Sequence, residues 1–172
     1  MRRRQAREIA LQFLYGYDLN PRDLDPALDD LWRSSKVRGE SKNFAMELIR
    51  GTIEKKDRLD AVIEKHALNW KLGRIALVDR NILRLGLYEL SFRDDIPPLV
   101  SINEAVDLAK KFSTDQSGSF VNGILDQTRK EMEKEEVRSQ KAEVKSKKSE
   151  GRSKKAEVGS KKSEGRRKKG KV

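Results

Sequence analysis

Apolar positions along most of this chain recur every three or four residues, which is the spacing of a helix with one buried face. Residues 5–19 follow this spacing and stop at Asn20-Pro21, and a shorter helix follows through Leu28 and Trp32. No segment alternates convincingly with a period of two, as a half-buried strand would. The pattern therefore predicts an all-α bundle of six or seven helices.

The middle of the chain predicts longer helices. One is expected over residues 41–63 and another over about residues 72–92. The prolines of the segment 95–98 then break the pattern, because two prolines cannot continue a helix. Beyond them, Ser101 and Glu104 have the spacing of a capping box and predict the start of the next helix.

The pattern changes at about residue 137, where apolar side chains become rare. Two similar segments of 14 residues follow one another there, KAEVKSKKSEGRSK and KAEVGSKKSEGRRK. A segment this polar cannot bury enough surface to offset the entropy lost on ordering, so we predict a disordered tail. The chain is thus expected to comprise an all-α domain, residues 1–136, and a low-complexity, lysine-rich tail, residues 137–172.

Charge separates the same two regions. The formal net charge is +11, and residues 1–136 hold 24 basic and 24 acidic side chains, so the whole excess lies in the tail. The tail is either a solubilising appendage or a non-specific electrostatic arm for RNA or DNA. The basic total does not by itself make the folded part a nucleic-acid binder.

The chain offers little for catalysis or for metal binding. It has no cysteine and a single histidine, His66, which argues against thiol chemistry, disulfides and clustered metal ligands, and no metal or cofactor is expected. The phosphate-binding glycine patterns and the nucleophile pattern G-x-S-x-G do not occur. The absence of cysteine favours a cytoplasmic protein, and the absence of a membrane-length apolar run argues against a membrane partner. Since no active-site pattern is present, we do not expect the chain to be an enzyme.

Five segments resemble the NusB family of bacterial transcription antitermination factors in content and order. They are Arg3–Tyr15, Val78–Leu90 (VDRNILRLGLYEL), Asp95–Pro98 (DIPP), Ser101–Phe112 (SINEAVDLAKKF) and Ser117–Asp126 (SGSFVNGILD). The resemblance covers about residues 2–132 and leaves the tail outside. It implies a fold of two perpendicular three-helix bundles without enzymatic activity. It also implies binding of single-stranded boxA-type RNA from ribosomal RNA transcripts, together with ribosomal protein NusE, in the RNA polymerase antitermination complex.

The resemblance implies that the arginine-rich N-terminus binds RNA. Arg2, Arg3, Arg4 and Arg7 occupy this motif here. Guanidinium groups suit RNA because they bind phosphate in a bidentate manner and stack on unpaired bases. The alternative is that Arg7 pairs with an acidic side chain while the terminal arginines remain in water.

A second segment is expected to continue the RNA track. It contains Lys110, Lys111, Phe112 and Gln116, with an aromatic ring available for stacking a base. Alternatively, Phe112 belongs to the core and the lysines form the solvated face of their helix.

The resemblance also implies a surface for NusE. Tyr15, Asp79, Arg80 and Phe120 match positions at which the family meets that protein. An acidic residue on an exposed helix face suits a basic ribosomal protein. The alternatives are that Asp79 and Arg80 form a local surface pair of little energetic value, and that Phe120 is a core residue.

Two other functions are compatible with the sequence. NusB-like modules precede the catalytic domain of certain ribosomal RNA methyltransferases, so the chain is alternatively a fragment of such an enzyme. A protein-interaction scaffold, or a homodimer that hides its own RNA face, also fits a body without net charge. The sequence does not decide between a monomer and a homodimer.

Overall fold

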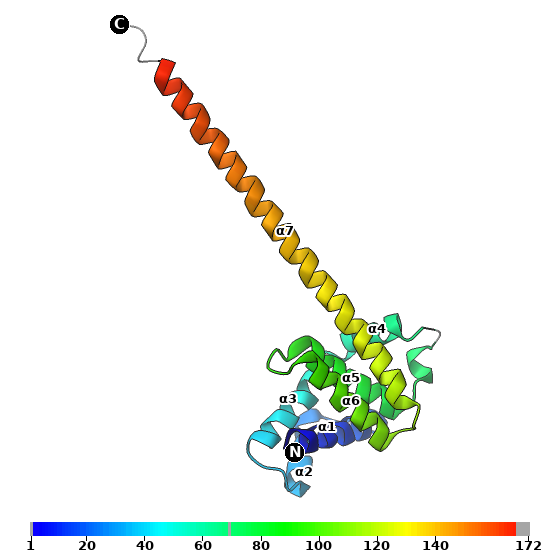
Figure 1. The fold of residues 1–172 in the computed structure, drawn as a ribbon. Helices are drawn as coiled ribbons and strands as arrows, with labels where there is room; N and C mark the ends of the chain where they lie inside the picture. Colours follow the sequence, from blue (N-terminus) through cyan, green and yellow to red (C-terminus); the bar gives the residue numbers. More distant parts are fainter. Residues whose placement is uncertain (1, 69, 168–172) are drawn as a thin grey trace. The chain divides into compact units, whose positions relative to one another are not determined.

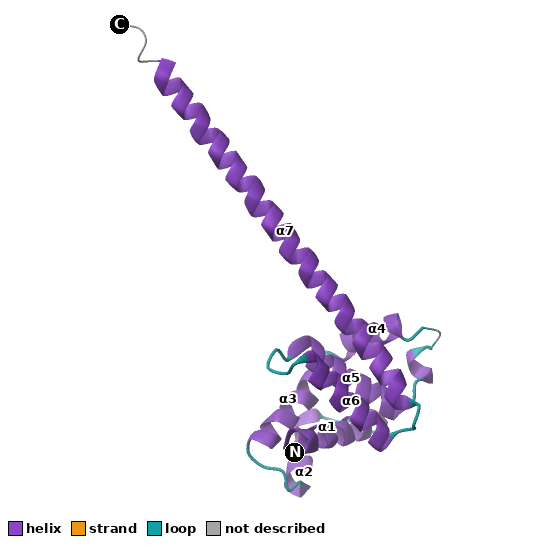
Figure 2. Cartoon of the chain, in the orientation of Figure 1, coloured by secondary structure: helices purple, strands orange, loops and turns teal. Residues whose placement is uncertain are grey.

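The computed structural model describes residues 2–68 and 70–167, which form helices and the loops that join them (Figure 1). In chain order the helices are α1 (Arg2–Leu19), α2 (Leu24–Ser34), α3 (Glu40–Glu54), α4 (Lys56–His66), the short 3-10 helix η1 (Leu72–Arg74), α5 (Leu77–Phe92), α6 (Pro98–Phe112) and α7 (Ser117–Arg167). Figure 2 shows no strand in this part of the chain, and the expected all-α fold is confirmed. No helix within the described ranges has the length and apolar character needed to cross a membrane.

The chain divides into two compact units, residues 1–129 and residues 130–172. The first unit contains α1 to α6 and the beginning of α7. The second contains the remainder of α7, and its residues 133–143 are all exposed. The division falls earlier than the boundary expected after residue 136.

Helix α5 lies at the centre of the first unit. It packs against α1, α3, α4 and α6, and most of its side chains are buried. Gly86 permits the close approach of α6 and α7 to this helix. A Cβ atom at position 86 would lie 2.9 Å from Cδ1 of Leu125 and 3.2 Å from Cβ of Ala105. Since the interior is close-packed, any larger side chain at this position forces the three helices apart.

Two of the expected helices differ from the observed ones. The helix predicted over residues 41–63 is divided at Lys55, whose backbone angles of φ −95° and ψ 8° depart from the helical region. The break allows α4 to bury Ile63 in the core. The helix predicted from Leu72 begins at Leu77, after η1.

The predicted capping box at Ser101 is wrong, because α6 begins earlier. Pro97 occupies the N-cap position and Pro98 the first helical position, where the fixed φ angle of proline is favourable. Ser101 is therefore inside the helix and buried, and its hydroxyl group donates to a carboxylate oxygen of Glu89 at 3.5 Å.

Helix α7 extends through residue 167, and the expectation of a disordered tail from residue 137 onward stays a prediction. The sequence also has a local preference for helix in this segment. Ala, Glu and Lys are strong helix formers, and a Lys follows each Glu of this segment four residues later in the sequence. The last part of the predicted tail, residues 168–172, lies outside the described residues.

A charged network joins the end of α1 to α4 and α5. Arg84 donates to the two carboxylate oxygens of Asp60 at 2.6 and 2.8 Å, and to Asp18 at 2.6 Å. Asn81 donates to the same oxygen of Asp18 at 3.1 Å. Burial tends to raise the pKa of Asp18, but the charge of Arg84, the hydrogen bond from Asn81 and the charge of Lys56 outweigh it and lower the pKa below its ordinary value of 3.8.

We expect Asp18 to make the stability of the fold depend on pH. Because its pKa is lower in the folded than in the unfolded chain, its contribution is complete above the unfolded value and is lost as the pH falls through the folded value. The free energy of unfolding of Asp18→Asn should lie below that of the wild type at neutral pH, and the difference should shrink at pH values under 3.8. Urea unfolding across this pH range measures it, with exposed Asp29→Asn as the control. A difference that does not change with pH would contradict the assignment.

Candidate RNA and protein interface

Helix α1 presents its first arginines at the surface. The side chains of Arg3 and Arg4 are 59% and 53% exposed, and Arg2 is also exposed. Arg3 lies 3.6 Å from a carboxylate oxygen of Asp95, and Arg4 pairs with two acidic side chains of α6, the nearer at 2.5 Å. Exposed ion pairs contribute little free energy, so these guanidinium groups can exchange a carboxylate for a phosphate at small cost.

Arg7 has a different environment, which corrects its predicted contact with RNA. The residue is 3% exposed, and its Nε and Nη2 atoms each donate to a carboxylate oxygen of Glu89 at 2.7 Å. Its Nη1 atom lies 3.4 Å from Glu104. The alternative, in which Arg7 pairs with an acidic side chain, is therefore the one observed. Arg7 fixes α1 to α5 and thereby positions the exposed arginines that precede it.

The ring of Phe44, on α3, supports the same end of α1. The guanidinium carbons of Arg3, Arg7 and Arg93 lie 5.1, 5.2 and 5.1 Å from its centroid, within the range of a cation–π interaction. The hydrogen bond from Arg93 is the largest of the effects that lower the pKa of Asp95, and it keeps this carboxylate charged beside Arg3.

The second predicted RNA segment lies against α1. The ammonium group of Lys111 donates to a carboxylate oxygen of Glu8 at 2.6 Å and lies 5.2 Å from the ring centroid of Phe112. Lys111 and Arg4 line the same small pocket, and Lys110 is exposed on α6. The fold therefore brings together two predicted RNA segments that lie far apart in the sequence.

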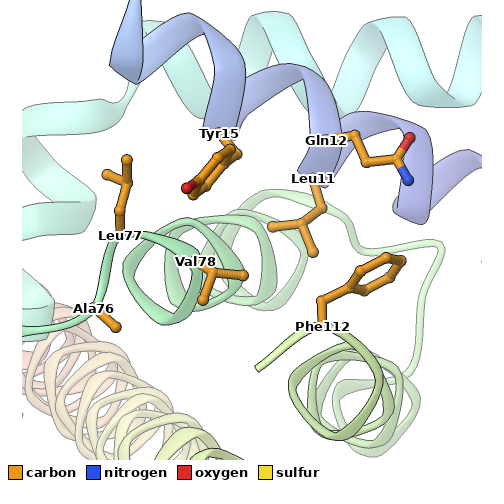
Figure 3. A pocket seen from close by; sticks show the side chains of 7 residues that line it. All are labelled: Leu11, Gln12, Tyr15, Ala76, Leu77, Val78 and Phe112. Carbon is orange, nitrogen blue, oxygen red and sulfur yellow. The ribbon is translucent and has the colours of Figure 1, made fainter. Parts of the chain in front are cut away.

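A groove of about 560 Å³ opens between α1, the start of α5 and the end of α6. It is lined by Leu11, Gln12, Tyr15, Ala76, Leu77, Val78 and Phe112 (Figure 3). Tyr15 is 40% exposed, while Phe112 is half-buried and packs partly against the core. An exposed apolar hollow of this kind is a candidate docking site. Tyr15, predicted to contact a partner protein, and Phe112, predicted to contact RNA, thus share one groove.

A second pocket, of about 320 Å³, lies between the segment before α5 and the beginning of α7. Its lining residues are Trp70, Arg74, Ile75, Ala76, Asp79, Thr114, Gln116, Ser117 and Phe120. Gln116 is exposed, and Phe120 is half-buried with part of its surface against the core. Here too a residue predicted for RNA lies beside one predicted for NusE, so the two expected surfaces adjoin.

Asp79 lies inside the protein, which corrects its predicted position on an exposed face. It is 8% exposed, and its Oδ2 atom accepts a hydrogen bond from the hydroxyl group of Ser117 at 2.9 Å. This contact joins the start of α5 to the start of α7. Arg80 is half-buried, and among the described residues no ion pair joins it to Asp79, so the alternative of a local surface pair is not observed either.

Sequence reasoning missed three residues of these sites. Trp70 is 55% exposed and, with the exposed Arg74, lines the second pocket. A tryptophan and an arginine in a polar connection between helices are a signal for this, because both residue types are enriched at interfaces. Glu89, the partner of Arg7, follows Leu85 and Gly86 at helical spacing and so falls on the buried stripe of α5.

The matched region of the chain coincides with its first unit. The model of the NusB family matches residues 4–130, and the second unit begins at residue 130. The chain belongs to the NusB family. A transcription antitermination protein NusB from a Nitratiruptor species is 45% identical over 130 residues, which are 76% of this chain and 93% of that protein. The NusB protein of Bacillus licheniformis is 45% identical over 133 residues, 77% of this chain and 100% of that protein.

Solved structures of NusB proteins have the same fold. T. maritima NusB is 39% identical with a TM-score of 0.67, over 75% of this chain and 91% of that chain. A chain from a crystal structure of the antitermination factors NusB and NusE in complex with double-stranded RNA is 30% identical with a TM-score of 0.68, over 75% of this chain and 96% of that chain. The curated relatives are named transcription antitermination proteins, and one of the solved NusB structures is a complex with NusE and RNA, which confirms the expectation that the chain is not an enzyme.

Proposed function

We propose that this chain is a transcription antitermination factor that binds boxA-type RNA of ribosomal RNA transcripts together with ribosomal protein NusE. The observation that carries the RNA contact is the continuity of basic and aromatic side chains from α1 to the end of α6. Arg4 and Lys111 line one pocket, and Lys111 lies beside the ring of Phe112. The acidic partners of these two cations, Glu8, Glu104 and Asp107, line the same pocket, and a phosphate would replace them. Such a track offers charges to the phosphates and a ring to an unpaired base.

The apolar groove around Tyr15 is the proposed contact for NusE. It adjoins the RNA track through Phe112, which lines both. A partner bound in the groove would therefore lie next to the RNA, and the two ligands can bind cooperatively through direct contact with one another. Phe120, which lines the second pocket, and the half-buried Arg80 stay in the proposed NusE surface, whereas Asp79 supports it from inside.

Binding titrations test this function. The RNA set contains a single-stranded boxA-like sequence, its scrambled counterpart and a double-stranded form, because the solved NusB–NusE complex contains double-stranded RNA. We expect the boxA-like single strand to bind best, with higher affinity when NusE is present. Equal affinity for the boxA-like and scrambled strands, with and without NusE, would contradict the proposal.

Tyr15→Ala should weaken the association with NusE by roughly tenfold, since truncating an aromatic anchor in an apolar interface costs more than about 1 kcal/mol. Binding of RNA by the isolated chain should change much less. Isothermal titration with NusE measures the first quantity and fluorescence anisotropy with labelled RNA the second. Leu99→Ala, at a 60% exposed position on α6 outside the groove, is the matched control. An equal loss in both variants would remove the groove from the NusE surface.

The wider assembly is part of the same proposal. We propose that the chain acts in the cytoplasm, as a component of the RNA polymerase antitermination complex. The methyltransferase-fragment and scaffold alternatives are not favoured, because relatives that the chain covers over 93% to 100% of their length are antitermination proteins. Gel filtration with and without RNA decides between a monomer and a homodimer whose RNA face is hidden.

A further inference from the structure

The second unit carries charge in a regular pattern that the proposed function does not use. Glu143, Glu150, Glu157 and Glu164 recur every seven residues. A Lys-Lys doublet begins four residues after each of them, so the segment is a series of heptads rather than a single 14-residue repeat. This segment begins beyond the family match, which ends at residue 130.

The pattern has a consequence for the helix. A Glu placed four residues before a Lys is the favourable order of an i,i+4 pair and stabilises a helix slightly. The pattern therefore favours the helix that α7 continues through residue 167. Glycines 151, 159 and 165 act in the opposite direction, and each of them lowers helix stability by more than one such pair adds.

The same pattern arranges the excess positive charge. On a helix, residues seven apart are separated by about 10.5 Å along the axis and drift around it by only about 20° per heptad. The doublets that begin at Lys147, Lys154 and Lys161 therefore recur at one slowly drifting register position along α7. A row of paired positive charges at regular spacing is complementary to a polymer of regularly spaced negative charges.

We propose that residues 137–167 form a helical arm that binds the phosphate backbone of nucleic acid without reading its sequence, and that the lysine doublets are its main contacts. The body of the protein then selects RNA, while the arm adds affinity for any phosphate chain through release of counterions. The proposal goes beyond the function of the first unit, because it does not require boxA recognition.

The test compares four full-length or shortened forms on scrambled RNA and on DNA of the same sequence. The first two are the wild type and residues 1–136, which retain all core residues of the first unit. The third is a doublet variant in which Gln replaces Lys147, Lys148, Lys154, Lys155, Lys161 and Lys162. The fourth is a control in which Gln replaces Arg138, Lys141, Lys145, Arg152, Arg166 and Arg167. The last two variants lose the same number of positive charges. Affinity is measured between low and moderate salt, and circular dichroism records the helix content.

We expect truncation to weaken binding to scrambled RNA and to DNA by similar factors, and to lower the slope of log affinity against log salt. The doublet variant should lose most of that slope, at about 0.7 to 0.9 per lost phosphate contact, and the control variant distinctly less. Unchanged binding after truncation would overturn the proposal that residues beyond 136 bind nucleic acid. Equal losses of affinity in the two six-residue variants would overturn the proposal that the doublets are the main contacts. Polyglutamate of matched charge that competes as well as RNA would overturn the assignment to nucleic acid. Failure of the proposed function has a different signature, namely no preference of residues 1–136 for boxA-like over scrambled RNA.

Discussion

Replacing Glu89 by alanine should lower the free energy of unfolding by about 3–5 kcal/mol, because the substitution leaves a buried guanidinium group without its main partner. Arg7 is 3% exposed and Glu89 is 2% exposed, and two hydrogen bonds of 2.7 Å join them. Glu104, at 3.4 Å from Arg7, retains part of the pairing and places the expected loss at the lower end of this range. Urea unfolding followed by circular dichroism measures the change.

Two further variants separate the buried pair from an ordinary ion pair. Arg7→Met combined with Glu89→Leu should recover much of the lost stability, because replacing both charges by apolar groups leaves no unpaired charge in the interior. Asp30→Ala removes the partner of Arg22 on the surface, where both side chains are about half exposed, and should cost less than about 1 kcal/mol. If Glu89→Ala is no more harmful than Asp30→Ala, the pair does not hold α1 against α5.

The apolar periodicity was sufficient to predict the class of the fold. Stripes such as Ala10, Leu11 and Leu14 on α1 are buried as expected, because burying apolar area is the dominant favourable term in folding. The division at Lys55 was not predictable in this way, since apolar residues continue at helical spacing on both sides of it. The break depends on how α4 packs against α5, which is a tertiary constraint.

The residue types of the candidate site were predictable from the sequence, but the burial of their side chains was less so. The resemblance to the family predicts surface contacts for Arg7 and Asp79, yet both are in register with buried positions of their helices, Ala10 and Leu14 for the first and Ile82 for the second. A charged residue on an apolar stripe is a signal for a buried, paired group. Its partner, Glu89 or Ser117, comes from another helix and cannot be identified from local spacing.

The segment 137–167 shows a second limit of prediction from composition. A low apolar content indicates that these residues have little to bury, and residues 133–143 are exposed. It does not exclude a helix, because pairs of opposite charge four residues apart stabilise one locally.

The N-terminal arginines should be the main determinant of RNA affinity in the first unit. Changing Arg2, Arg3 and Arg4 together to alanine removes three exposed guanidinium groups and leaves the buried Arg7–Glu89 pair intact. If each binds one phosphate, the slope of log affinity against log salt should fall by about 0.7 per contact for a single strand, and affinity at about 0.1 M salt should fall on the order of 10- to 100-fold. Fluorescence anisotropy with boxA-like RNA at several salt concentrations, using residues 1–136 to exclude the tail, measures both quantities.

The matched control removes the same charge from another part of the surface. Arg22, Arg33 and Arg50 are all exposed and line neither of the pockets that Arg2, Arg3 and Arg4 line, and their replacement by alanine changes the net charge equally. This second triple variant should bind RNA nearly as well as the wild type, because charges that do not contact the RNA are largely screened at this salt concentration. Both variants should keep the native circular dichroism spectrum, since no core side chain is altered. Equal loss of affinity in the two variants would mean that net charge governs binding, and unchanged affinity in the first would mean that RNA contacts the body elsewhere than at the start of α1.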